Sequence, residues 1–307
     1  MHQKEHHNFI MRKFVRFMNF LIRIIYLVSK LPLKILYVFS DIIFFLNYYI
    51  VGYRKNVITR NLERSFPDKS KAEIRDIKKK FYRNFSDYLV ETIKSFSISE
   101  TESRVRMQHI NQEVFHEAKA EGKNIILLAG HVFNWEWINA LATLVPQDHC
   151  HPVYRKVNSN FWENQMKKLR NRFGNEALEA NEVILNIFRS KNDGSSAYMF
   201  VADQTPHFAH ITYGTEFLNQ KTPVFNGYDK LATRMNLVFI YCEMKKVKRG
   251  FYQVNYHRIH PEGEKFQEHE VVKKFHKLLE NTLHKHPDNY LWSHRKWKYE
   301  DSIKNMI

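Results

Sequence analysis

The segment LLAGHVFNWEW, residues 127–137, places a histidine and a glutamate close together directly after an apolar run. His131 and Glu136 could form a catalytic pair in which the carboxylate accepts the imidazole N–H, so that the other ring nitrogen is free to act as a base. Such a pair suits deprotonation of a substrate hydroxyl for attack on an acyl carbonyl. The plain alternative is a loop histidine without a catalytic role, beside a glutamate that is favoured at the start of a helix.

The rest of the chain offers no protein nucleophile in a recognisable setting. There is no G-x-S-x-G elbow, no glycine-rich phosphate loop and no metal-ligand spacing such as H-E-x-x-H. The only cysteines, Cys150 and Cys242, fit neither a disulfide framework nor a thiolate metal site. We therefore expect no cofactor and no metal, and we expect a direct transfer between two bound substrates.

Two apolar runs predict the strands that position these groups. Residues 124–129 are too few for a helix and predict a buried central strand that ends at Gly130. Residues 197–203 predict a second strand, which closes at Asp203 and is followed by Gln204. Because functional groups of α/β sheets gather beyond the carboxyl ends of strands, both polar clusters are expected at such ends.

Helical and extended patterns alternate along the rest of the body. Ser70 and Glu73 have capping-box spacing, and apolar residues then recur at helical intervals, which predicts a helix over about 71–96. This alternation predicts an α/β fold with a mixed central sheet covered by helices. Further helices are expected at residues 112–121, 137–145, 160–173 (ending at Gly174) and 268–285, and further strands at 151–154, 236–244 and 251–259.

The net charge of +16 implies an anionic partner. Half of that excess lies in residues 1–60, which contain ten Lys and Arg residues against two acidic residues and are also dense in aromatic and aliphatic side chains. A basic and apolar composition of this kind favours an anionic membrane surface as the partner, and not nucleic acid.

Residues 8–30 predict an interfacial helix, because a spanning helix would place Arg23 at mid-depth in the bilayer. Residues 32–51 are mostly apolar but contain Lys34 and Asp41, so a spanning or re-entrant segment is open but less favoured. The other alternative is that both helices simply pack on the protein core. No small-residue cleavage site follows, which argues against a secretory signal peptide.

These patterns divide the chain into two predicted parts. Residues 1–52 form basic, apolar helices that associate with a membrane, and residues 53–307 form the catalytic domain. Basic flanks favour attachment to the cytoplasmic leaflet of the membrane.

An ordered series of motifs extends over about residues 30–300. In order, the motifs are RKNVITRNLERSFPD (54–68), Gly-His-x-x-Asn-Trp-Glu (130–136), VYRKVNSNFWE (153–163), RNRFG (170–174), VADQ (201–204) and HPDNYLWSHRKWKYE (286–300). This series resembles the late acyltransferases of lipid A biosynthesis, the lauroyl and myristoyl transferases of the lysophospholipid acyltransferase superfamily.

The resemblance implies an inner-membrane enzyme that moves a fatty acyl chain from an acyl carrier protein thioester, or from acyl-CoA, to a hydroxyl of a lipid A precursor. It makes His131 the general base and Glu136 its orienting partner. For each implied arginine contact, the alternative is a solvated surface charge. For Asp203 and Gln204, which close a strand, the alternative is a structural role. The substrate contacts that the resemblance implies are Asn134, Arg155, Asn158, Arg172, Asp203, Gln204 and Arg295.

Departures from the family pattern leave the acceptor open. Lys156 replaces a proline, and Asn219 and Lys221 stand in a segment that is usually rich in glycine. The same scaffold could acylate an aminolipid or a lysophospholipid. A basic, membrane-associated scaffold without catalytic activity is a further alternative.

Overall fold

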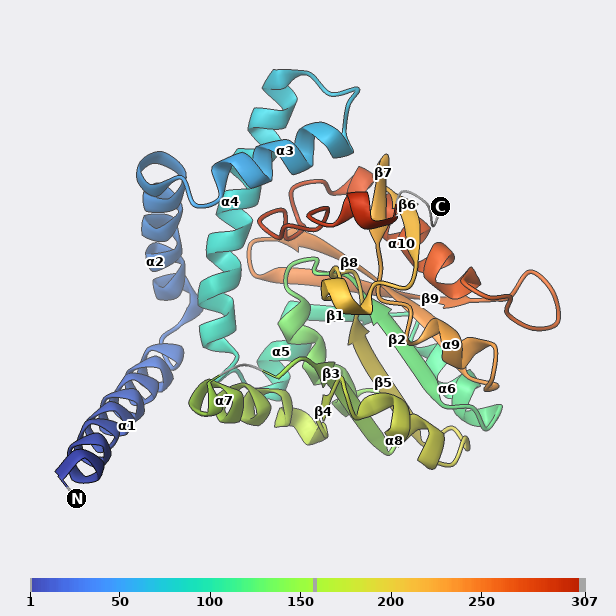
Figure 1. The fold of residues 1–307 in the computed structure, drawn as a ribbon, viewed down its shortest axis with the longest axis horizontal. Coiled ribbons are helices and arrows are strands. Elements are labelled where there is room, and N and C mark those ends of the chain that lie inside the picture. Colours follow the sequence, from blue (N-terminus) through green and yellow to red (C-terminus); the bar gives the residue numbers. More distant parts are fainter. Residues whose placement is uncertain (1, 157–158, 304–307) are drawn as a thin grey trace.

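A seven-stranded mixed sheet forms the centre of the protein in the computed structural model, which describes residues 2–156 and 159–303 (Figure 1). The strand order is β1-β9-β8-β2-β5-β3-β4, and β8–β9 is the antiparallel pair among otherwise parallel neighbours. The predicted mixed α/β fold is confirmed. The strands are β1 (Met107–Ile110), β2 (Ile125–Ala129), β3 (His149–Tyr154), β4 (Leu178–Glu179), β5 (Ser196–Val201), β8 (Val238–Lys248) and β9 (Phe251–Ile259), with a separate hairpin of β6 (Gly214–Phe217) and β7 (Gln220–Pro223).

Helices surround this sheet, and most of them lie where the sequence predicts them. The predicted capping box is present: the Ser70 hydroxyl accepts from the Glu73 N–H, and the Glu73 carboxylate accepts from the Ser70 N–H at 2.8 Å. The α-helices are α1 (His2–Ser29), α2 (Leu33–Phe45), α3 (Lys55–Ser65), α4 (Lys71–Lys94), α5 (Glu100–Arg106), α6 (Glu113–Ala120), α7 (Asn160–Arg170), α8 (Val183–Arg189), α9 (Asp229–Ala232) and α10 (Glu270–Lys285).

Two predicted helices differ from expectation in form. The segment predicted as a helix over 137–145 is a 3-10 helix, Trp135–Thr143. The helix expected over 160–173 ends earlier, at Arg170, and a separate 3-10 turn, Arg172–Gly174, follows it. Gly174 has a φ of 83°, a left-handed conformation that glycine adopts without steric cost.

Strand β2 lies between β8 and β5, and every residue of Ile125–Ala129 is buried. Gly130 follows directly because there is no room for a side chain: a Cβ there would lie 2.7 Å from Cδ1 of Leu279 on α10. The packing of Leu279 therefore favours glycine at position 130, and His131 lies just beyond the carboxyl end of β2.

Helix α4 is buried on two sides, because it lies between α2 and the body of the protein (Figure 1). One side carries the predicted apolar residues. The other side is polar and buried, which the apolar spacing did not predict, and it comprises Asn84, Asp87, Glu91 and Lys94.

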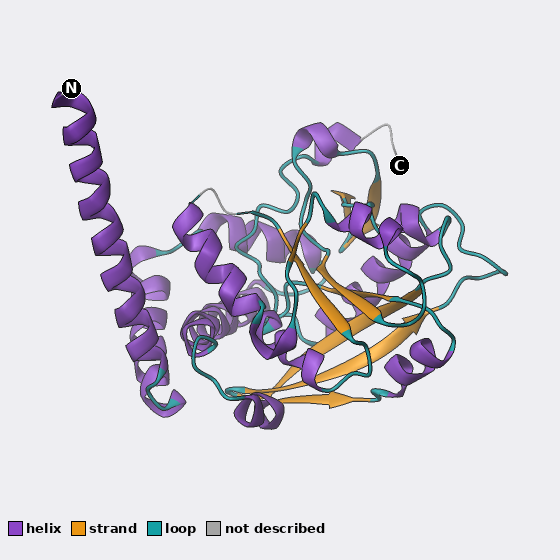
Figure 2. Ribbon diagram, turned by 90° about the horizontal axis from the view of Figure 1, so that it is seen from below, coloured by secondary structure: helices purple, strands orange, loops and turns teal. Residues whose placement is uncertain are grey.

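The N-terminal helices expose much apolar surface. Figure 2 shows α1 extending away from the body, and the basic residues Arg16, Arg23 and Lys30 on α1 and in the turn after it are exposed. Among the described residues, Leu33–Val51 is the stretch long and apolar enough to cross a membrane, with a mean hydropathy of 1.5 and only 17% of it buried. One face of α2 packs on α4, and the other exposes Ile35, Val38, Phe39, Ile42 and Phe45.

Candidate active site

A cavity of about 350 Å³ lies where β2, β3 and β5 end. Three of its polar lining residues, His131, Arg155 and Gln204, follow the carboxyl ends of these strands. The other ionisable or polar lining residues are Glu136, Asn139, Tyr154 and Arg170. The apolar part of the lining comes largely from the strands and includes Leu127, Ala129, Val153, Met199 and Val201. The cavity therefore joins an apolar wall to a cluster of ionisable groups.

The His131 imidazole is held at both ring nitrogens. Its Nδ1 lies 2.6 Å from Asp203 Oδ1, which also accepts the His131 backbone N–H at 3.0 Å. Its Nε2 lies 2.8 Å from the amide nitrogen of Gln204. Because a carboxylate only accepts and an amide nitrogen only donates, Nδ1 carries the proton and Nε2 presents its lone pair. This is the tautomer that a base acting through Nε2 needs.

The predicted contact between His131 and Glu136 is wrong, since both ring nitrogens have other partners. The register of the sheet explains the pairing with Asp203. Strands β2 and β5 are parallel neighbours with Ala129 opposite Val201, so the residues two positions further along each strand emerge side by side. Strand order, and not closeness in sequence, therefore selects the partner of His131.

Glu136 lies in the first turn of the 3-10 helix that follows the loop. Its Oε1 is 3.7 Å from Arg170 Nη2, and the Trp135 ring lies against the imidazole with a centroid distance of 4.9 Å. The Arg170 guanidinium also lies over the Tyr154 ring, 5.1 Å from its centroid. Glu136 thus lines the cavity as the partner of an arginine.

Asp203 is buried and receives hydrogen bonds from several directions. Its Oδ2 accepts from the Tyr290 hydroxyl at 2.7 Å, and its backbone carbonyl accepts from the buried Lys296 ammonium. Burial by itself raises the pKa of Asp203, but the neighbouring His131 and Lys296 and the hydrogen bonds lower that pKa below its ordinary value. Burial also lowers the pKa of Lys296, to about 8, against the opposing effect of Asp203. Asp203 is therefore ionised at neutral pH.

The C-terminal segment fixes the loop that carries His131. The Leu291 N–H donates to the His131 carbonyl at 3.1 Å, and the Phe133 N–H donates to the Asn289 carbonyl at 3.2 Å. The Asn289 side chain donates back to the Phe133 carbonyl at 2.8 Å. The tail motif that contains these residues thus builds one side of the site.

Asn134 shapes the site without lining the cavity. It is fully buried, its Oδ1 accepts the Glu136 N–H at 3.2 Å, and its Nδ2 donates to Glu91 at 2.9 Å. The first bond caps the 3-10 helix that carries Glu136.

The remaining predicted contacts fall in different places. Arg155 lines the cavity. Arg172 lies outside it, because its guanidinium donates to the carbonyls of Ser95 and Ile98, where α4 ends. Arg295 is exposed and also lies outside the cavity lining. Asn158 lies outside the described residues.

Comparison with known families shows which family the chain belongs to. A model of the bacterial lipid A biosynthesis acyltransferase family matches residues 2–299. The chain belongs to this family. The resemblance read from the ordered motifs is confirmed, and the protein is an acyltransferase of lipid A biosynthesis. A comparison with curated proteins gave no match.

Three residues of this candidate site were missed by sequence reasoning. Arg170, Tyr290 and Lys296 all lie within motifs that carry the family resemblance. Arg170 and Arg172 stand two positions apart in RNRFG. Helix α7 ends at Arg170 and a separate 3-10 turn begins at Arg172, so the two side chains reach different parts of the protein. The motif was therefore a sufficient signal for the region, but it did not show which arginine reaches the cavity.

The thiols and potential metal ligands give no second site. Among residues 2–156 and 159–303, no group of three or more His, Cys, Asp and Glu side chains could hold a metal ion. Both cysteines are buried, and burial raises the pKa of Cys150 to about 12 and raises the pKa of Cys242 further. Neither thiol is suited to act as a nucleophile.

Proposed function

We propose that this acyltransferase moves a fatty acyl chain from an acyl carrier protein thioester to a hydroxyl of a lipid A precursor, with His131 as the general base. The observation that carries the proposal is the position of His131 beside an apolar cavity, with Nδ1 2.6 Å from the buried carboxylate of Asp203. Acyl-CoA is a second thioester that could supply the same group.

The acceptor hydroxyl replaces the Gln204 amide at His131 Nε2 and gives its proton to that nitrogen. Its oxygen attacks the thioester carbonyl carbon, and the resulting imidazolium is stabilised by Asp203. When the tetrahedral intermediate collapses, the carbon–sulfur bond breaks and the thiolate takes the proton back from Nε2. The products are the new ester and the free thiol, and His131 returns to its starting form.

The other lining residues divide the remaining tasks. The apolar wall from β2, β3 and β5 receives the acyl chain, since burial of each methylene contributes about 0.8 kcal/mol. Arg155 and Arg170 bind anionic groups, such as the phosphates of the substrates or the developing oxyanion. Glu136 holds Arg170 in place for that purpose.

The N-terminal helices hold the enzyme on the cytoplasmic face of the inner membrane. The exposed face of α2 inserts among the lipid chains, while its other face stays on α4. A spanning arrangement is less suitable, because Asp41 and Arg83, each 49% exposed and paired at 3.1 Å, lie along this contact and would enter the hydrocarbon. The basic surface of the chain also suits an acidic carrier protein.

Mass spectrometry of total lipids from cells that lack the protein tests the acceptor. The expected result is lipid A that lacks one acyl chain. Expression of the wild-type protein should restore that chain, and expression of His131→Ala should not. Unchanged lipid A with an altered aminolipid or lysophospholipid would overturn the proposed acceptor while keeping the chemistry. No change in the acylation of any lipid would contradict the proposed reaction and favour a scaffold.

A further inference from the structure

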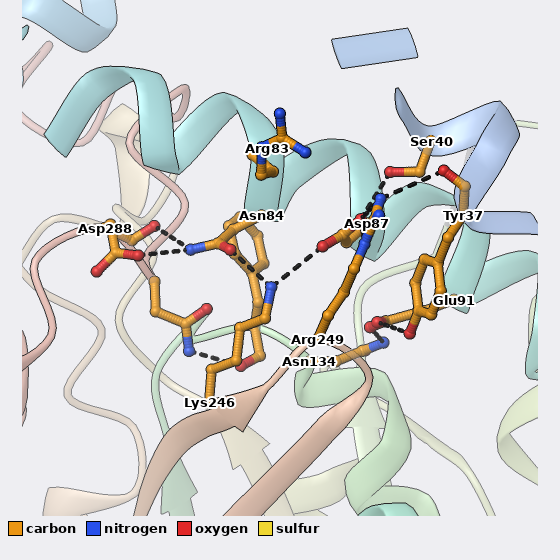
Figure 3. A network of polar contacts seen from close by, with 12 residues as sticks. Tyr37, Ser40, Arg83, Asn84, Asp87, Glu91, Asn134, Lys246, Arg249 and Asp288 are labelled. Atoms are coloured by element: carbon orange, nitrogen blue, oxygen red, sulfur yellow. Dashed lines mark hydrogen bonds and ion pairs between the residues drawn. The ribbon is translucent and has the colours of Figure 1, made fainter. Parts of the chain in front are cut away.

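Helix α4 carries two buried carboxylates one turn apart, Asp87 and Glu91, on the side that faces α2 (Figure 3). Both side chains are fully buried, and each accepts a hydrogen bond from a hydroxyl group of α2. A buried carboxylate is costly unless it is paired and hydrogen-bonded. The hydrogen-bond partners of each carboxylate therefore show which elements it holds together.

Asp87 is paired with two cations, Lys246 near the end of β8 and Arg249 in the turn between β8 and β9. Arg249 donates to its Oδ1 from Nη2 at 2.7 Å and from Nε at 2.9 Å, and Lys246 donates to its Oδ2 at 3.1 Å. The Ser40 hydroxyl of α2 also donates to Oδ1, at 2.7 Å. This cluster joins α2 and α4 to the end of the hairpin. The hydrogen-bond partners described for Asp87 include no residue of the active-site loop, although Lys246 also donates to Asn84, whose amide donates to Asp288 in the C-terminal tail.

The described partners of Glu91 are all neutral donors, and they come from three different elements. Its Oε1 accepts from the Tyr37 hydroxyl of α2 at 2.8 Å. Its Oε2 accepts from the Tyr252 hydroxyl of β9 at 2.7 Å and from the Asn134 amide at 2.9 Å. One carboxylate thus connects the helix that bears the exposed apolar face to the first residue of the active-site turn, as Figure 3 shows.

A second contact ties Glu91 to the same turn. Its backbone carbonyl accepts from the Trp137 indole N–H at 3.2 Å. Asn134 in turn caps the N–H of Glu136, whose carboxylate is the partner of Arg170. The path from α2 to the cavity therefore runs from Tyr37 to Glu91, Asn134 and Glu136, through contacts of 3.2 Å or less.

We propose that Glu91 is a positioning residue of the active site, which holds the Asn134–Glu136 turn in place and makes its geometry depend on the seating of α2. Helix α2 is then part of the scaffold of the site as well as a membrane contact. A lipid surface that engages its exposed face and stabilises its packing on α4 also stabilises the turn that carries Glu136. The catalytic part of this inference rests on the proposed function.

The chain offers a matched pair of variants for the test. Tyr37→Phe and Ser40→Ala each remove one hydroxyl of α2 that donates to a buried carboxylate of α4. Only the carboxylate that Tyr37 reaches also holds Asn134. The full-length chains are compared by hydrogen–deuterium exchange of residues 134–143 and by steady-state transfer from an acyl carrier protein thioester to a lipid A precursor.

The expected result is faster exchange in residues 134–143 of Tyr37→Phe and a kcat about tenfold lower, as loss of one hydrogen bond to a buried carboxyl group predicts. The KM for the donor should change little. Ser40→Ala should match the wild type in both measurements. Glu91→Gln, which keeps a single oxygen acceptor, should exchange at least as fast as Tyr37→Phe.

The inference is overturned if residues 134–143 of Tyr37→Phe exchange at the wild-type rate. It is also overturned if Ser40→Ala accelerates exchange in these residues as much as Tyr37→Phe does. Because exchange does not depend on turnover, it decides the inference even if the wild type transfers no acyl group to a lipid A precursor. That last result would instead count against the proposed function.

Discussion

Two buried carboxylates, Asp203 just after the carboxyl end of β5 and Glu91 on α4, contact the same active-site segment in opposite electrostatic settings. Asp203 lies beside His131 and Lys296, and these neighbours outweigh the effect of burial and lower its pKa. Glu91 is held by hydroxyls and an amide, and burial raises its pKa despite them. In the reaction that we propose, one carboxylate therefore provides charge for proton transfer and the other provides geometry.

The largest expected effect is that of Asp203→Asn. The asparagine keeps the shape of the side chain but removes the charge that stabilises the imidazolium, so kcat should fall by roughly 10²- to 10⁴-fold. Steady-state transfer rates measure this loss, with thermal unfolding to confirm the fold. Glu136→Gln is the control for the pairing, and it should lose less because Glu136 does not contact the imidazole. A larger loss in Glu136→Gln than in Asp203→Asn would break the comparison.

A smaller loss of activity is expected on substitution of Arg170, the first arginine of RNRFG. Comparing it with Arg172 contrasts a cation inside the cavity with one outside it. Arg170→Ala should lower kcat/KM by about 10- to 100-fold, because it removes a charged donor from the cavity. Arg172→Ala should leave kcat unchanged and reduce the free energy of unfolding by about 1–3 kcal/mol, because carbonyls at the end of α4 lose their donor. Kinetics and urea unfolding of both variants separate the two roles. The reverse assignment of effects would contradict the account.

The smallest expected effect is the pH dependence of stability at Glu91. Its pKa is raised in the folded protein, so the folded state keeps this proton to a higher pH than the unfolded chain does. The contribution of this proton to the free energy of unfolding is fully present below 4.5, the ordinary pKa of a glutamate. It is lost as pH rises through the pKa that Glu91 has in the folded protein. The unfolding free energy of the wild type, relative to Glu91→Gln, should therefore fall as pH rises above that value. Urea unfolding across this range checks the sign, and a relative free energy that rises with pH would be inconsistent with the role of Glu91.

The sequence predicted those parts of the fold and site that depend on local patterns. The capping box at Ser70 and Glu73, the buried strand before Gly130 and the placement of His131 and Asp203 after strands all follow from short-range spacing. The family motifs also marked the correct regions.

What could not be predicted depends on contacts between distant elements. The partner of His131 follows from β2 and β5 being neighbours, which no local pattern reveals, and Glu136 was the nearer carboxylate in the sequence. Glu91 gave no signal, because a carboxylate on an amphipathic helix is ordinarily solvated. Its burial follows from the packing of α2, β9 and the Asn134–Trp137 segment around α4.

The central claim is that His131, fixed by Asp203, is the base of acyl transfer. Its most direct test is the steady-state rate of purified His131→Ala with an acyl carrier protein thioester and a lipid A precursor. The account predicts a loss in kcat of at least roughly 10²-fold with the folded structure retained. A folded His131→Ala protein that transfers the acyl group at the wild-type rate would contradict it.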